Sequence, residues 1–196
     1  MKYLILIVSF LFSQTVFCQL RSIGKPRPLT KKEQYQDSAN KHCVHLTKFS
    51  ISQRLGFFPF KKASKVKLCS FDLQPKSFTN EIPKIGTAVD VSKLQEVISL
   101  NEKQTISLSD ILYNTGYKGI FYSFSEGCYY PRNAILFLDD TNTVFAYIEL
   151  CFQCYGFKVS SKDVRSGDFC IEKYELLRQF FKEAGVHFGT ELTVTD

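Results

Sequence analysis

The most specific chemical motif in this sequence is a Cys-x-x-Cys pair, Cys151-Phe-Gln-Cys154. Such a pair is a dithiol redox site when a helix begins at the second cysteine, because the helix N-terminus lowers the thiol pKa. The residues after Cys154 are instead typical of a β-strand. A structural zinc site would need two more ligands, which Cys128 and Cys170 could supply. Since there is no second Cys-x-x-Cys, we favour structural disulfides over both alternatives.

One acid, Glu149, interrupts an apolar stretch next to this motif, and burial of a carboxylate is costly without a partner. Asp139-Asp140-Thr141-Asn142 precedes the stretch, which predicts a β-hairpin with strands at 133–138 and 143–152. A four-residue loop places Arg132 opposite Glu149, whereas a three-residue loop places Asn133 there. We favour the first register and an Arg132–Glu149 ion pair. The alternative is a general acid or ligand-binding carboxylate with a raised pKa.

The elements that must position these residues follow from periodicity and capping signals. Both faces of the second hairpin strand are apolar, which predicts a strand covered on both sides. Strands are also predicted at 66–73, 94–100, 120–124 and 155–160. Helices are predicted from Lys31 to Lys48, from Asn101 to Tyr113 and from Phe169 to Ala184, the last with Asp168 as its N-cap. This order of elements predicts an α+β single domain, mainly an antiparallel sheet with two or three helices packed on it.

The first 18 residues have the pattern of a secretory signal peptide. Lys2 gives a positive start, and the apolar core from Leu4 to Phe12 is too short for a membrane span of ~20 residues. Cleavage after Cys18 would make Gln19 the mature N-terminus, while the alternative is a lipoprotein acylated on Cys18. No other segment is expected to span a membrane. The sequence thus predicts an exported protein, periplasmic or extracellular.

The predicted mature chain divides into a basic flexible leader over residues 19–30 and a single α+β domain over residues 31–196. Removal of the signal peptide leaves an even number of cysteines, which favours disulfides in an exported chain. These six are Cys43, Cys69, Cys128, Cys151, Cys154 and Cys170.

Charge and the remaining motifs exclude several function classes. The formal net charge of +6 is modest, and no nucleic-acid motif accompanies it, so we expect no nucleic-acid partner. Four lysines between positions 61 and 67 are typical of a guarded strand edge, with weak contact to anionic surfaces as the alternative. His42 and His45 would share a helix face but have no third ligand at metal-site spacing. No hydrolase, zinc-protease, P-loop or dinucleotide signature is present.

CYYPRNAILFLD, YIELCFQC and ELLRQFFKEAGVHFGT resemble segments of exported bacterial proteins of no established function. The resemblance covers the last third of the chain and implies no activity. Our first hypothesis is a secreted or periplasmic, disulfide-stabilised binding or interaction module with a protein or small-molecule partner and no cofactor. The second is a thiol- or metal-dependent enzyme centred on Cys151, Cys154 and Glu149. The candidate residues are Arg132, Glu149, Cys128, Cys151, Cys154 and Cys170.

Overall fold

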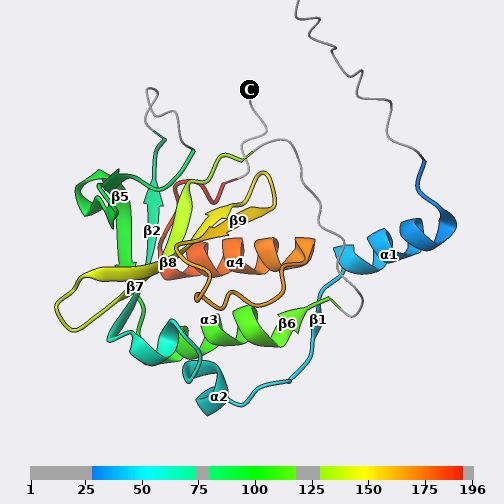
Figure 1. Ribbon diagram of the computed structural model, residues 1–196, viewed down its shortest axis with the longest axis horizontal. Helices are drawn as coiled ribbons and strands as arrows, with labels where there is room; N and C mark the ends of the chain where they lie inside the picture. The colour runs from blue at the N-terminus through cyan, green and yellow to red at the C-terminus, as the bar shows by residue number, and fades with distance from the viewer. Residues whose placement is uncertain (1–27, 74–79, 118–128, 192–196) are drawn as a thin grey trace, which may run out of the picture.

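A five-stranded antiparallel sheet forms the centre of the protein (Figure 1). The computed structural model describes residues 28–73, 80–117 and 129–191. The predicted signal peptide, most of the basic leader, the strand predicted at 120–124 and Cys128 lie outside these ranges. The sheet has the order β5-β2-β7-β8-β9. Its strands are β2 (Lys65–Phe71), β5 (Leu94–Ser99), β7 (Asn133–Leu138), β8 (Val144–Cys151) and β9 (Gly156–Val159).

Helices and short strand pairs surround this sheet. The helices are α1 (Lys31–Lys41), α2 (Ile51–Leu55), α3 (Glu102–Asn114) and α4 (Ile171–Ala184), with single 3-10 turns η1 (Phe60–Lys62) and η2 (Val91–Lys93). Two short antiparallel pairs join β1 (Val44–His45) to β6 (Thr115–Gly116) and β3 (Lys84–Ile85) to β4 (Ala88–Val89). The predicted α+β single-domain class is confirmed.

Capping boxes start three of the helices. In α1 the Thr30 hydroxyl accepts from the Glu33 backbone N–H, while the Glu33 carboxylate accepts from Thr30 in return. The same reciprocal bonds start α2 at Ser50 and α3 at Asn101. The predicted extension of α1 to Lys48 is wrong, because residues 44–45 pair with β6 instead.

Helix α4 starts later than its sequence predicted. Its N-cap is Cys170, which makes no side-chain capping bond, rather than Asp168. At the other end, Gly185 adopts a left-handed conformation with φ 100°, and its N–H bonds to Phe181 and Lys182 carbonyls. The predicted end of this helix at Ala184 is therefore confirmed.

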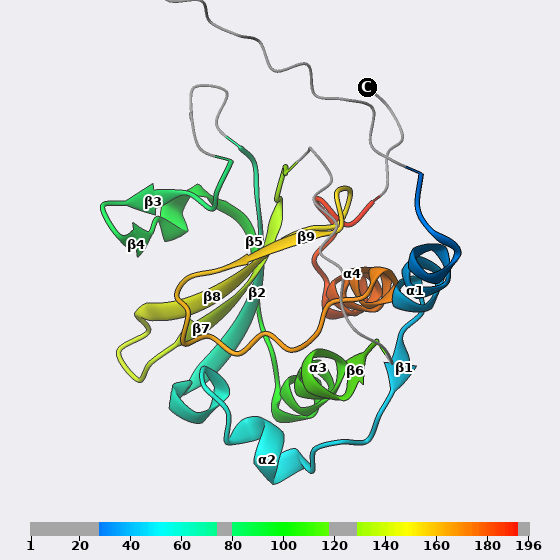
Figure 2. The same ribbon diagram turned by 45° about the vertical axis from the view of Figure 1, so that its right-hand side comes forward.

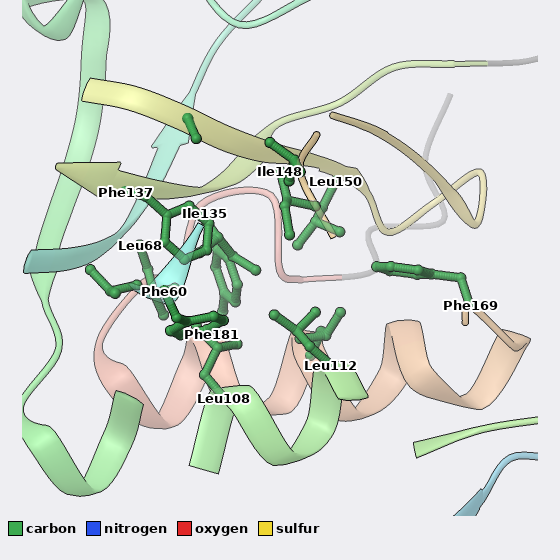
Figure 3. Packing of buried hydrophobic residues seen from close by; sticks show 14 of the residues in the cluster. Phe60, Leu68, Leu108, Leu112, Ile135, Phe137, Ile148, Leu150, Phe169 and Phe181 are labelled. Atoms are coloured by element: carbon green, nitrogen blue, oxygen red, sulfur yellow. The ribbon is translucent and has the colours of Figure 1, made fainter. Parts of the chain in front are cut away.

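The main core lies between one face of the sheet and helices α3 and α4 (Figures 2 and 3). Leu108 and Leu112 of α3 and Phe181 of α4 are fully buried there, and they face apolar side chains from β2, β7 and β8. Burial of each such side chain contributes about 1.5–3 kcal/mol. The sheet residues of this cluster are Val66, Leu68, Ile135, Phe137, Ala146, Ile148 and Leu150.

A second, smaller core covers the opposite face of the sheet. The segment from residue 80 to β5, which includes the β3–β4 hairpin, lies on this side, away from α3 and α4 (Figure 2). Ile82 from this segment is 2% exposed and packs there. Its sheet partners are Cys69, Phe71, Ala134, Leu136 and Leu138. Both faces are therefore covered, as the apolar pattern of the second hairpin strand predicted.

The predicted hairpin exists, but both predicted registers are wrong. Asn133 pairs with Leu150 and Ala134 with Glu149, and the register shifts at the turn so that Leu138 pairs with Val144. The loop includes Thr143, because the Asp139 carboxylate accepts from the backbone N–H groups of Thr141 at 3.0 Å and Thr143 at 2.9 Å. This bulged register separates Arg132 from Glu149.

Candidate functional site

Glu149 is a structural latch between three parts of the chain. Its side chain is 1% exposed and lies on the sheet face that carries the smaller core. One carboxylate oxygen accepts a short hydrogen bond from the Ile82 backbone N–H, and the other accepts from the Tyr129 hydroxyl at 2.6 Å. The carboxylate thus fixes the segments at 80–83 and 129–130 onto β8.

Opposing influences act on the Glu149 carboxyl group. Burial raises the pKa of Glu149, while the hydrogen bonds from Tyr129 and Ile82 and the charge of Lys158 oppose that rise. Burial, together with the negative charge of Glu149, also raises the pKa of Tyr129. Because each carboxylate oxygen of Glu149 accepts a hydrogen bond and the group is buried, this geometry is that of a carboxylate with a structural role.

The predicted Arg132–Glu149 ion pair does not form. The Arg132 guanidinium instead lies 5.8 Å from the Tyr130 ring centroid and 5.7 Å from that of Phe188. Its buried Nε atom has no hydrogen-bond partner among the residues that the structure describes. The physical reason is the register: Ala134, two residues further along β7, takes the position opposite Glu149.

The cysteines divide into bonded and free groups. Cys43 and Cys170 form a disulfide across a sequence separation of 127 residues, and Cys154 is also disulfide-bonded. Cys69 and Cys151 are free and buried. The strand ends at Cys151, whose sulfur accepts from the Tyr130 backbone N–H at 3.4 Å. Burial raises the pKa of the Cys151 thiol, whereas a nucleophilic thiol needs a lowered one.

The two histidines of the predicted metal pair have separate partners. His42 contacts Glu172 of α4 at 2.7 Å, and His45 contacts Asp110 of α3 at 2.6 Å. Within residues 28–73, 80–117 and 129–191, no group of three or more His, Cys, Asp and Glu side chains is placed to hold a metal ion. The histidines instead attach the segment after α1 to α3 and α4.

A pocket opens on the same sheet face as Glu149, but it does not include that residue. It has a volume of about 370 Å³ and lies between the β3–β4 hairpin and the ends of β8 and β9. Its lining residues are Lys84, Gly86, Thr87, Val89, Val144, Phe145, Tyr147, Ser160 and Ser161. This size is at the lower end for small-molecule sites.

The pocket is linked to the Glu149 latch through Glu81. The Glu81 carboxylate contacts the Lys84 ammonium at 2.8 Å and the Lys158 ammonium at 3.5 Å. The Lys84 ammonium lies 5.7 Å from the centroid of the Tyr147 ring, and the Lys158 ammonium lies 4.5 Å from that of Tyr129. The hydrogen bond with Glu81, supported by contact with Tyr147, raises the pKa of Lys84. Lys84 is therefore a stable cation at the pocket wall.

Sequence reasoning missed every residue of this pocket. Lys84, Thr87 and Ser160 lie in segments that read as loop or strand end, and their chemistry arises only when the hairpin folds over β8. The alternation of Tyr147 with Glu149 on one face was the single available signal. It places Tyr147 beside the acid, but it does not reveal an opening there.

Comparison of the chain with protein-family models, curated proteins and solved structures gives no match. Among the helices of the described ranges, none combines the length and apolar character needed to cross a membrane. The candidate function therefore rests on the chain's own geometry.

Proposed function

We propose that this protein is an exported, disulfide-stabilised binding module that holds a small ligand in the pocket between the β3–β4 hairpin and β8. The observation that carries the proposal is the pocket itself. It combines an apolar wall, formed by Val89, Val144 and Phe145, with several polar side chains that converge from three different segments. Ligand sites in proteins typically have this combination.

Export is supported by the signal-peptide pattern of residues 1–18 and by the disulfides. The bond between Cys43 and Cys170 joins β1 to the N-cap of α4. Such long-range disulfides persist in oxidising compartments such as the periplasm and the extracellular space. The two buried free thiols are packing residues in this proposal.

A fragment screen by two-dimensional amide NMR on the purified mature protein tests the proposal. The screen uses neutral, anionic and cationic fragments of up to about fifteen heavy atoms. We expect the hits to shift the amide signals of Gly86, Thr87, Tyr147, Ser160 and Ser161 together. Hits that cluster on another surface, or no hits from any charge class, would overturn the pocket as the binding site.

A matched pair of variants separates pocket binding from general surface binding. Thr87 is exposed at the hairpin turn, so Thr87→Tyr fills the pocket mouth without a change in the core. Gln95 is exposed on β5 outside the pocket, so Gln95→Tyr adds the same ring elsewhere. Thr87→Tyr should weaken the affinity of the protein for the fragment hits at least tenfold, while Gln95→Tyr should leave that affinity unchanged.

A further inference from the structure

We infer that the pocket selects a small carboxylate with a compact apolar or aromatic body. This inference rests on the proposed function, because it names the ligand class of the same pocket. Three features carry it: the donor-rich polar lining, the Lys84 ammonium group in that lining and the apolar residues that share the pocket with it.

All polar side chains of the lining can donate hydrogen bonds. These are Lys84, Thr87, Tyr147, Ser160 and Ser161, and the lining contains no carboxylate. The Ser160 oxygen already accepts from the Tyr147 backbone N–H at 3.0 Å, which leaves its hydroxyl proton for another acceptor. A ligand that presents acceptors therefore meets a possible donor at every polar side chain of the lining, and a carboxylate presents two oxygens with several acceptor sites.

The charges beside the pocket favour an anion. Two ammonium groups, from Lys84 and Lys158, share the carboxylate of Glu81. The charge of Lys158 also acts on the buried Glu149 carboxyl group, so the positive charge that faces the pocket is that of Lys84. Lys84 belongs to the lining, whereas Glu81 contacts it from outside. A bound carboxylate would complete a second charge-assisted hydrogen bond to Lys84.

A further ammonium group, that of Lys62, lies 4.7 Å from the centroid of the Phe145 ring, but Lys62 is not one of the lining residues. Its charge is offset by Asp139, whose carboxyl pKa is lowered mainly by hydrogen bonds with Thr141 and Thr143 and also by Lys62. We therefore assign the anionic group of the ligand to the Lys84 side. The body of the ligand then packs against Val89, Val144 and Phe145.

The volume limits the body to a compact group. About 370 Å³ accommodates a single ring or a short branched chain with its carboxylate. Affinity for such a small ligand is bounded by its few heavy atoms, so millimolar to micromolar binding is expected.

Three probes of similar size test the ligand class: benzoate, benzamide and benzylamine, each titrated by amide NMR at pH 7. Benzoate should shift the pocket amides with an affinity at least tenfold higher than that of benzamide, and benzylamine should not bind. Lys84→Met should weaken the affinity for benzoate at least fivefold. Glu81→Gln should strengthen that affinity, since the carboxylate that competes for Lys84 is removed. Lys103 is exposed on α3 across the sheet, so Lys103→Met is the control and should change nothing.

The outcomes distinguish this inference from the proposed function. If benzamide or benzylamine shifts the pocket amides as strongly as benzoate does, the carboxylate selectivity is overturned while pocket binding stands. If none of the three probes shifts those amides, the inference is overturned, and the wider fragment screen decides the proposed function separately. A Lys84→Met variant that binds benzoate as tightly as the natural chain would also overturn it.

Discussion

The carboxylate of Glu149 illustrates how one buried acid can be retained for structure. It accepts from the Ile82 N–H and the Tyr129 O–H, so it satisfies one donor from each of the two segments that it holds against β8. An unsatisfied buried donor costs ~1–3 kcal/mol. The acid therefore stabilises the fold through the donors that it satisfies, although burial opposes its ionised form.

Glu149→Gln and Glu149→Leu should have different effects on stability. The glutamine carbonyl can accept from Ile82 and its amide can donate to Tyr129, so the free energy of unfolding at pH 7 should change by less than ~1 kcal/mol. Leucine leaves both donors unpaired and should lower that free energy by ~2–4 kcal/mol. Urea unfolding measures both, and a glutamine variant as unstable as the leucine variant would contradict the latch.

The pH dependence gives a second readout for the same pair of variants. The folded-state pKa of Glu149 lies above its unfolded value, so its contribution to stability is present at acidic pH. That contribution is lost as pH rises from ~4.3 through the folded pKa. Glu149→Gln should remove this decline, and a pH profile identical to that of the natural chain would contradict the raised pKa.

Lys173 is a second buried ionisable residue, and it lies on the helix side of the sheet. It is 0% exposed, and its ammonium donates to the Leu112 carbonyl at 2.7 Å. That carbonyl belongs to the last turn of α3, where no intrahelical donor is available. Lys173 therefore ties α4 to the C-terminal end of α3, where a positive charge is favoured by the helix dipole.

Lys173→Met should flatten the pH dependence of stability above neutrality. Burial lowers the pKa of Lys173 to about 7, so the lysine destabilises the fold at pH 6.5 and less so as pH rises toward its unfolded pKa. Between pH 6.5 and 9 the natural chain should gain about 2 kcal/mol from this group. The variant should lack that gain, while Lys103→Met on the exposed face of α3 should keep it.

At the scale of elements, the disulfide fastens the N-terminal segment to α4. Cys43 lies just before β1, and Cys170 is the N-cap of α4. The Glu172 carboxylate supports this junction, because it accepts from the Cys43 backbone N–H at 2.7 Å and contacts His42. Helix α1 is otherwise mostly polar, so this junction holds it to the domain.

The double variant Cys43→Ala/Cys170→Ala should lose ~2–5 kcal/mol of unfolding free energy, since a long loop is no longer closed in the unfolded chain. Amide hydrogen exchange should accelerate more over residues 31–45 than over β7, because the junction is local to that segment. Equal exchange over residues 31–45 in both proteins would mean that the Glu172 contacts alone hold α1.

The hairpin shows where sequence reasoning reached its limit at this scale. The turn residues and the two apolar runs predicted the elements correctly, because these signals are local. The register depended on whether Thr143 joined the loop, and the Asp139 side chain decides that by binding its N–H. One extra residue in the loop and the bulge next to it, between Phe137 and Leu138, together moved the partner of Glu149 from Arg132 to Ala134. The actual donors, Tyr129 and Ile82, come from segments without a periodic signal.

At the scale of the whole molecule, the two faces of the sheet have different roles. The helix-covered face holds the larger core, and its elements were predictable from 3.6-residue periodicity and caps. The other face is covered by residues 80–94, whose sequence carries few regular signals, and both the latch and the pocket lie there. The candidate site was therefore the least predictable part of the fold, since only tertiary packing assembles it.

The oxidation state of the cysteines tests the whole architecture together with export. In protein recovered from an oxidising compartment, a maleimide should label neither Cys69 nor Cys151, because each is 0% exposed. After unfolding it should label these two, while Cys43 and Cys170 should be recovered as one linked peptide. Cys154 should also be recovered in a linked peptide.

The same mass spectra should place the mature N-terminus at Gln19 if residues 1–18 are a signal peptide. An acylated Cys18 would instead indicate membrane anchoring. A linked Cys151–Cys154 peptide would contradict the bonded and free groups of the structure and would favour the dithiol hypothesis. Labelling of Cys69 before unfolding would mean that the second face of the sheet opens in solution, because Cys69 lies in the smaller core beneath the segment that carries the β3–β4 hairpin.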